Sequence, residues 1–170
     1  TNMQLKFESE LKESPDNMWK WITSAEGINH ELFPMLHMSS LYNFSTKNLD
    51  TIQLGVPITK SWLLLFGLLP IGFSELTLVE LDIGERFIEQ SEMSFMKSWR
   101  HERIIIPHGA GTIIRDVLTY EPIMLNKSCT FFIKLLFHNR HKKFLEFQNL
   151  KKDKIIFNRR DLLKDLRFYI

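Results

Sequence analysis

The strongest constraint on the fold is a long helix near the C-terminus whose first half is apolar almost all round. Phe131 and Leu135 widen its apolar stripe until little of that half remains polar. Such a helix half has to be buried rather than laid on a surface. If it runs over residues 126–150, it is about 37 Å long at roughly 1.5 Å per residue, enough to cross a whole sheet. The stripe comprises Leu125, Cys129, Phe132, Ile133, Leu136, Phe137, Arg140, Phe144 and Phe147.

The chain begins with a strand and two short helices. Residues 5–11 alternate between apolar and polar side chains, which predicts a half-buried strand. Ser14 followed by Pro15 is a helix-start signal, with Ser14 as N-cap and Pro15 in the first helical position. We expect this helix to stop at Gly27 and a second short helix to cover residues 28–33.

Six further strands are expected between the short helices and the long one. Turn-forming residues separate them, and the last four are joined by short turns, so they are antiparallel. Together with the first strand they predict an α+β fold with a seven-stranded antiparallel sheet. The six strands cover residues 37–44, 58–66, 73–83, 86–93, 95–106 and 112–120, with residues 67–72 as a loop.

Charge is distributed unevenly along the chain, although the net charge is only +2. Residues 1–125 carry 10 Lys and Arg against 16 Asp and Glu, whereas residues 126–170 carry 12 against 4. The basic end either docks on an anionic partner, or lies against the acidic body of the same or a neighbouring subunit. We therefore expect a domain over residues 1–150 and a basic extension over 151–170 that forms another short helix.

Cysteine content and hydropathy give expectations about the cellular compartment of the protein. A single Cys129 cannot form an internal disulfide, which favours a reducing, cytoplasmic compartment. Lys6 and Glu8 interrupt the apolar stretch that a secretory signal would need. The longest apolar run, residues 62–73, is too short to cross a membrane, because a spanning helix needs roughly twenty residues. We interpret this run as a buried strand and loop, and the alternative is a loop that dips into a bilayer surface.

Common sequence signatures of nucleotide and zinc binding are missing. The sequence contains no GxGxxG, GxxxxGK[ST], HExxH or CxxC motif. His138 and His141 lie three residues apart on the long helix and are half of a metal site in one interpretation. Basic residues near a helix end also complement its dipole without any metal. We expect neither a metal nor another cofactor.

The sharpest polar cluster lies on the last two expected strands. Alternation places Trp99, His101 and Arg103 on one face of the first of them. On the second, Asp116 and Tyr120 share a face with apolar residues, which indicates that this face is inward. A buried carboxylate needs a partner because burying a lone charge is very costly, and His101 or Arg103 lies across the hairpin. The cluster is a polar floor for a ligand, a structural ion pair, or a solvated ladder.

Three stretches resemble one family. They are residues 62–70, residues 137–141, and the hairpin with Trp99-x-His101-Glu102-Arg103 followed by Gly111-Thr112-x-x-x-Asp116-x-x-x-Tyr120-Glu121-Pro122. They are similar to the bacterial polyketide-cyclase-like branch of the SRPBCC superfamily, which includes START lipid-transfer domains and birch-pollen-allergen-like proteins. The resemblance covers residues 4–147. It implies a helix-grip fold, in which a curved sheet wraps around a long C-terminal helix, and an apolar cavity between the two.

These patterns predict a helix-grip domain that binds or carries a small lipid-like, aromatic or polyketide-like ligand. One alternative is a cyclase- or dehydratase-type enzyme in the same cavity, with His101 as general base and Arg103 steadying an enolate. Another is an interaction module that docks through its basic end. We expect a monomer or homodimer with no transmembrane segment, at most weak membrane-surface contact and no specific nucleic acid partner. We assign no catalytic residue, and the expected ligand-binding residues are Trp99, His101, Arg103, Asp116, Tyr120, Phe132, Ile133 and Leu136.

Overall fold

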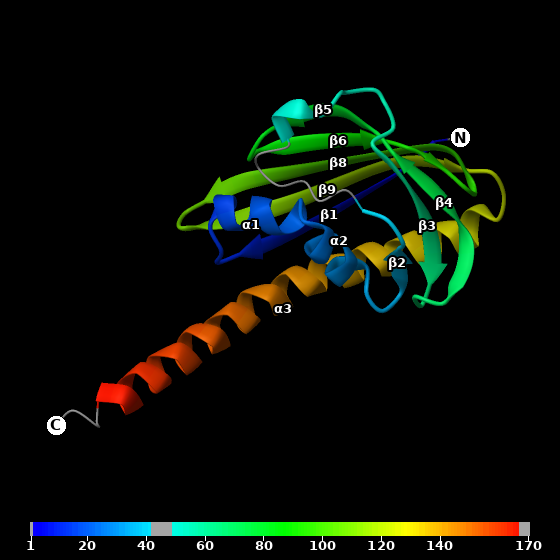
Figure 1. Ribbon diagram of the computed structural model, residues 1–170. Coiled ribbons are helices and arrows are strands. Elements are labelled where there is room, and N and C mark those ends of the chain that lie inside the picture. Colours follow the sequence, from blue (N-terminus) through cyan, green and yellow to red (C-terminus); the bar gives the residue numbers. More distant parts are fainter. Residues whose placement is uncertain (1, 42–48, 167–170) are drawn as a thin grey trace.

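Two antiparallel sheets and two short helices pack against one side of a long C-terminal helix (Figure 1). The computed structural model describes residues 2–41 and 49–166, with side chains up to residue 149. No helix in this part of the chain is long and apolar enough to span a membrane. The elements are β1 (Met3–Leu11), α1 (Pro15–Ile22), α2 (Ala25–Leu32), β2 (Leu36–Met38), a 3-10 turn (Leu49–Thr51), β3 (Thr59–Leu65), β4 (Leu69–Leu76), β5 (Leu78–Asp82), β6 (Arg86–Gln90), β7 (Glu92–Met93), β8 (Met96–His108), β9 (Gly111–Pro122) and α3 (Asn126–Leu166).

The α+β class and the antiparallel pairing are confirmed, but the prediction of one seven-stranded sheet is wrong. Within the described residues, one sheet has the order β1-β9-β8-β6-β5 and the other has the order β2-β3-β4-β7. The expected strands 73–83 and 86–93 each divide between the two sheets. They divide side by side, at Thr77 and Ser91, where the Thr77 N–H donates to Ser91 Oγ at 3.1 Å. Two neighbouring strands therefore bend together from one sheet into the other.

The expected loop over residues 67–72 is also wrong, because most of it belongs to β4. The chain reverses between β3 and β4 at Phe66 and Gly67, which both have positive φ, the conformation of a tight hairpin turn. Pro70 is tolerated in β4 because the ladder is irregular beside its partner Leu64. Of the strand expected over residues 37–44, only the start lies in β2, and its last three residues lie outside the described residues.

The short helices confirm one expected boundary and correct another. Ser14 caps α1, its Oγ accepting from the Asn17 N–H, and Pro15 opens the helix. Gly27 does not stop this helix but lies inside α2. Ser24 caps α2, because its Oγ accepts from the Gly27 N–H at 2.9 Å. Helix α1 therefore ends at Thr23, before the glycine at which the sequence predicted its end, because the next residue already caps α2.

The long helix begins at Asn126 as expected and then differs in two ways. It continues without a break to Leu166, so the residues expected to form a separate short helix after residue 150 are part of α3 up to that point. Burial is one-sided: Ile133 and Phe137 face the sheet, while Phe131 and Leu135 are exposed. The expectation that the first half is buried all round is therefore wrong. The division into a domain and an extension at residue 150 stays a prediction.

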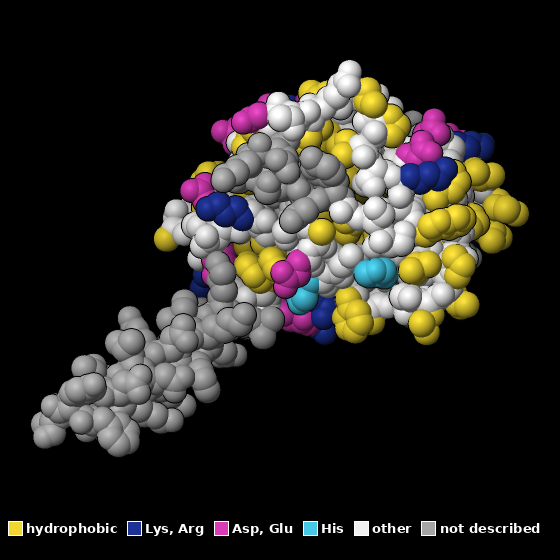
Figure 2. Space-filling model, in the orientation of Figure 1, with side chains coloured by type: hydrophobic (Ala, Val, Ile, Leu, Met, Phe, Trp, Pro, Cys, Tyr) yellow, Lys and Arg dark blue, Asp and Glu magenta, His cyan; other side chains and the backbone are white. Residues whose placement is uncertain are grey.

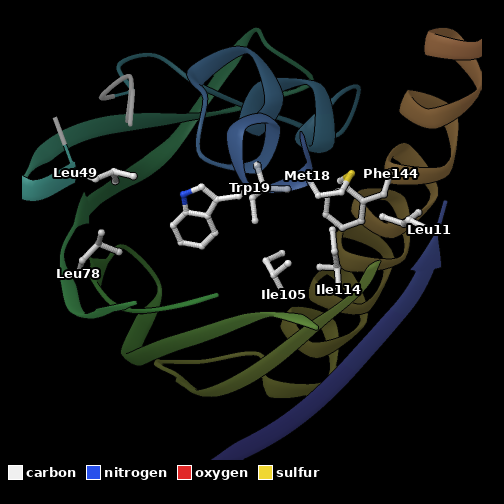
Figure 3. Packing of buried hydrophobic residues seen from close by; sticks show 9 residues of the cluster. Leu11, Met18, Trp19, Leu49, Leu78, Ile105, Ile114 and Phe144 are labelled. Carbon is white, nitrogen blue, oxygen red and sulfur yellow. The ribbon is translucent and has the colours of Figure 1, made fainter. Parts of the chain in front are cut away.

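The hydrophobic core is thickest where α1 packs against the five-stranded sheet. Met18 and Trp19 of α1 meet Ile105 of β8, Ile114 of β9 and Phe144 of α3 (Figure 3). Helical spacing on α1 and period-two spacing on the strands bring these side chains to one place. This core fills one end of the sheet and leaves space at the other end, where the first turns of α3 lie.

We predict that Gly27→Ala destabilises the protein, although alanine usually stabilises a helix by about 0.5–1 kcal/mol relative to glycine. A Cβ at Gly27 would lie 2.0 Å from the backbone oxygen of Trp21, so α1 and α2 would have to separate. We expect a loss of about 1–3 kcal/mol in the free energy of unfolding, measured by urea denaturation. The control is Glu26→Ala on the exposed side of α2, expected within about 0.5 kcal/mol of wild type. Equal or greater stability of Gly27→Ala would contradict this close approach.

Candidate functional site

A pocket of about 470 Å³ lies between the sheets and the first half of α3. Its wall is mainly apolar, because α3, α2 and the four-stranded sheet all turn leucine, isoleucine and phenylalanine side chains toward it. Volumes of about 300–1,000 Å³ are usual for small-molecule sites. Representative apolar lining residues are Leu32, Leu63, Ile71, Phe132, Ile133 and Leu136.

A polar sector interrupts the apolar wall where β8 faces α2 and α3. It contains Glu89, His101, Arg103 and Arg140, all of which line the pocket. Arg103 is fully buried and forms a two-pronged pair with Asp116, with Nε–Oδ1 at 2.7 Å and Nη2–Oδ2 at 2.9 Å. Charge-assisted pairs of this geometry are the strongest side-chain hydrogen bonds in proteins.

The remaining donors of Arg103 reach the short helix α2. Its Nη1 donates to both carboxylate oxygens of Glu31, at 3.2 and 3.1 Å. Arg140 of α3 approaches the same carboxylate from the other side, with its Nε 2.9 Å from Glu31 Oε2. One chain of charges therefore joins β9, β8, α2 and α3.

Two histidines complete the coordination of Asp116. His101 Nε2 lies 2.8 Å from Oδ1, and His141 Nε2 lies 2.9 Å from Oδ2. With the two bonds from Arg103, the carboxylate accepts four hydrogen bonds, which is its full capacity. The other nitrogen of His141, Nδ1, shares a hydrogen bond with the Ser9 hydroxyl at 2.7 Å, which ties this ring to β1 as well as to Asp116.

His101 lies between two carboxylates. While Nε2 faces Asp116, Nδ1 lies 3.5 Å from Glu89 Oε2. An imidazolium satisfies both contacts, because each nitrogen then carries a proton to donate.

Electrostatics keep this network ionised despite its burial. Burial alone would raise the pKa of Asp116, but Arg103 and His101 beside it hold that pKa well below its ordinary value of 3.8. Burial likewise acts to raise the pKa of Glu89, and the hydrogen bond with His101 lowers it overall. For Arg103, burial lowers the pKa, yet Asp116 and Glu31 outweigh this effect and raise it. All three groups are charged at neutral pH.

The structure places most of the expected site residues at the pocket. Six of them line it: Trp99, His101, Arg103, Phe132, Ile133 and Leu136. Asp116 lies behind Arg103 rather than in the pocket wall. Tyr120 packs its ring against Trp99 and donates its hydroxyl hydrogen to Thr130 Oγ1 at 3.0 Å, also away from the wall.

Three polar residues of the site were not predicted, namely Glu31, Glu89 and Arg140 in their roles as network partners. Arg140 carried a usable signal, because it falls inside the apolar stripe of the long helix, where a guanidinium requires a carboxylate. Glu31 gave no comparable signal, since it is 72 positions from Arg103 in the chain. Partnerships over such a distance depend on how α2 packs, which local patterns do not specify.

The same geometry bears on metal binding. His141 points to Asp116, whereas His138 packs edge-on against Phe7, so the two histidines do not converge. Among the side chains of residues 2–41 and 49–149, no three His, Cys, Asp or Glu groups are arranged to hold a metal ion.

Known structures place the chain among helix-grip-like folds, the kind of fold found in the SRPBCC superfamily. CV1439 from Chromobacterium violaceum is similar with a TM-score of 0.62 and 13% identity, over 82% of this chain and 94% of that one. Ara h 8.0201 is similar with a TM-score of 0.60 and 10% identity, over 87% and 98%. DynU16, a protein in the dynemicin biosynthetic locus, has a TM-score of 0.54 and 10% identity, over 84% of this chain and 47% of that one. At these identities the likeness shows the fold alone.

The chain belongs to the family described as Domain of unknown function (DUF8410), which matches residues 9–147. The match spans the end of β1, the short helices, the other strands and the half of α3 that roofs the pocket. No curated protein matches the sequence. The polyketide-cyclase-like branch stays a prediction.

We predict that Arg103→Leu lowers the free energy of unfolding by about 3–5 kcal/mol, because Asp116 and Glu31 would remain buried without their shared cation. Urea denaturation followed by circular dichroism measures the loss. Arg115→Leu is the matched control on β9: its pair with Glu8 is partly exposed, and its removal should cost far less stability than that of Arg103. Similar effects of the two substitutions would show that the buried network contributes little.

Acid should abolish the contribution of Asp116 to stability. Its pKa is lower in the folded than in the unfolded chain, so the ionised carboxylate stabilises the fold fully above pH 3.8, and this stabilisation is lost as pH falls through the lower folded pKa. We expect Asp116→Asn to melt well below wild type at neutral pH, and the difference to shrink below pH 3.8. Melting temperatures across this pH range test it. A difference that stays constant on acidification would assign the effect to shape rather than charge.

Proposed function

We propose that this protein binds or carries a small, mainly apolar molecule in the pocket between the sheets and α3. The observation that carries the proposal is the pocket itself, about 470 Å³ with an apolar wall and one confined polar sector. That combination is usual for small-molecule sites, where apolar area provides affinity and a few polar groups fix orientation. The shared fold of DynU16, a protein of a biosynthetic locus, supports a small organic ligand.

Two unsatisfied polar groups indicate what the ligand carries besides its apolar body. Ser74 Oγ and Trp99 Nε1 are buried without a hydrogen-bond partner, and both residues line the pocket. Buried polar groups without partners cost stability, so a partner from a bound molecule would be favourable. An indole N–H only donates, while a hydroxyl donates or accepts. We infer a ligand with a neutral acceptor, such as a carbonyl, ether or hydroxyl oxygen, in reach of Trp99.

The proposed contacts divide between a roof and a wall. Phe132, Ile133 and Leu136 of α3 form the roof, and Trp99, His101 and Arg103 of β8 form the wall opposite. Asp116 and Tyr120 act through these residues: Asp116 holds Arg103 and His101 in place, and Tyr120 supports the ring of Trp99. All eight residues therefore keep a place in the proposed site, six of them in direct contact.

The polar network favours a binder over a cyclase. A general base needs a ring nitrogen with a free lone pair, whereas both nitrogens of His101 face carboxylates. Arg103 directs its donors to Asp116 and Glu31, which leaves it poorly placed to steady an enolate. These charges order the pocket wall and take no part in proton transfer under this proposal.

We predict that Leu136→Trp abolishes uptake of N-phenyl-1-naphthylamine, a neutral apolar dye whose fluorescence rises in apolar sites. Leu136 lines the pocket from α3, and an indole in its place would occupy space that the dye needs. Because the pocket has room for the indole, we expect the melting temperature to stay near the wild-type value.

The control for this prediction lies next to it on the same helix. Leu135 is 44% exposed and points away from the pocket, so Leu135→Trp should leave dye affinity unchanged. In a filled core, Leu136→Trp would instead cost about 1–3 kcal/mol of stability. A clear drop in melting temperature, with no dye uptake by the wild type, would refute the proposed binding function.

A further inference from the structure

Large apolar side chains are exposed around the open end of the pocket. The β3–β4 hairpin presents Phe66, Leu68 and Leu69, and Leu68 is 82% exposed. The connection from α2 to β2 adds Phe33, and the connection from β9 to α3 adds Met124 and Leu125. We call these six residues the apolar rim. They come from three segments that are far apart in the sequence.

Backbone contacts hold these segments next to one another. The Phe66 N–H donates to the Met35 oxygen at 3.0 Å, which ties the hairpin to the α2–β2 connection. On the α3 side, the Ile123 N–H donates to the Phe95 oxygen at 2.8 Å, and the Phe95 ring lies against Gly72 of β4. Figure 2 shows hydrophobic side chains gathered on this side of the molecule, over β3, β4 and the start of α3.

The apolar rim is continuous with the pocket. Phe95, Met124 and Leu125 are more than half exposed, and they also line the pocket. They therefore mark its mouth. Soluble monomers rarely expose an apolar area this concentrated unless it contacts a partner. The sequence interpretation of residues 62–73 as a buried strand and loop is wrong for this reason, since the tip of the hairpin is open to solvent.

The charges among these segments have one sign. Residues 33–38, 62–73 and 123–135 contain Lys127 and Lys134 and no Asp or Glu. Both lysines are exposed, and neither forms an ion pair with another described residue. They lie about two turns apart and so on one face of α3, and Lys127 follows Leu125 of the apolar rim by two residues in the chain. An apolar surface with lysines beside it is the pattern of proteins that bind anionic membrane surfaces.

We propose that the apolar rim docks on an anionic lipid surface, with the β3–β4 hairpin and the β9–α3 connection entering the headgroup region. Apolar side chains would leave water for the acyl boundary, and Lys127 and Lys134 would contact lipid phosphates. A second copy of the chain fits less well, because symmetric pairing would bring like charges together. The proposal uses the start of α3, not the basic extension, and it does not depend on the pocket holding a ligand.

Vesicle sedimentation tests this proposal on the full chain. The probes are vesicles of phosphatidylcholine alone and of phosphatidylcholine mixed with phosphatidylglycerol. We expect wild type to sediment with the mixed vesicles, and Phe66→Ser combined with Leu68→Ser to weaken this binding at least about tenfold. Lys127→Glu combined with Lys134→Glu should remove the preference for the mixed vesicles. The matched control is Ile83→Ser, an exposed apolar residue at the β5–β6 turn near the far end of β8, which should bind like wild type.

Several results would overturn the proposal. They are absence of vesicle binding by wild type, equal weakening by Ile83→Ser, and a dimer in light scattering that the Phe66 and Leu68 substitutions dissociate. The last would assign the apolar rim to an interface between copies. Leu136→Trp separates this proposal from ligand binding, because it should lose dye uptake and keep vesicle binding. Unchanged melting temperatures show that each variant is folded.

Discussion

The buried ion pair between Arg103 and Asp116 is the interaction on which the arrangement of the other elements depends. Both groups are fully buried, so each requires complete compensation, and the compensation comes from four elements. Glu31 fixes α2 against the sheet, Arg140 fixes α3 against α2, and His141 adds a second link to α3. Hydrophobic contact alone would let these elements slide, whereas directional bonds to charged groups specify one arrangement.

This network also explains how an apolar pocket persists next to a well-packed core. Side chains around an empty apolar space tend to collapse into it, since contact with other atoms is favourable. The helices that would have to move are held by charges that lose their partners if they shift. Loss of a partner from a buried pair costs about 3–5 kcal/mol, which is of the same order as the burial of one or two large apolar side chains. The polar sector thus acts first as a support for the pocket.

The sequence predicted local structure better than it predicted which distant residues and strands contact one another. The N-cap at Ser14, the start of α3 at Asn126, the antiparallel hairpins and the buried position of Asp116 all follow from spacing and residue type, which operate over a few positions. The division of two strands at Thr77 and Ser91 did not, because apolar and polar residues continue past both points and do not state which neighbour a strand joins. Glu31 was missed for the same reason. The exposure of the β3–β4 hairpin was missed because its apolar side chains predict burial.

The paired bend at Thr77 and Ser91 has a mechanical consequence. Two of the links between the four-stranded and the five-stranded sheet are these crossings, which lie side by side and are bonded to each other. Such a connection bends easily about the line that joins the two crossings and resists rotation about other directions. We expect the four-stranded sheet, which carries Leu63 and Ile71, to rotate as a rigid unit. The pocket wall on β8 stays in place because its charged side chains are paired. The rotation of that sheet then sets the width of the pocket. It therefore also sets the range of ligand sizes that the protein accepts.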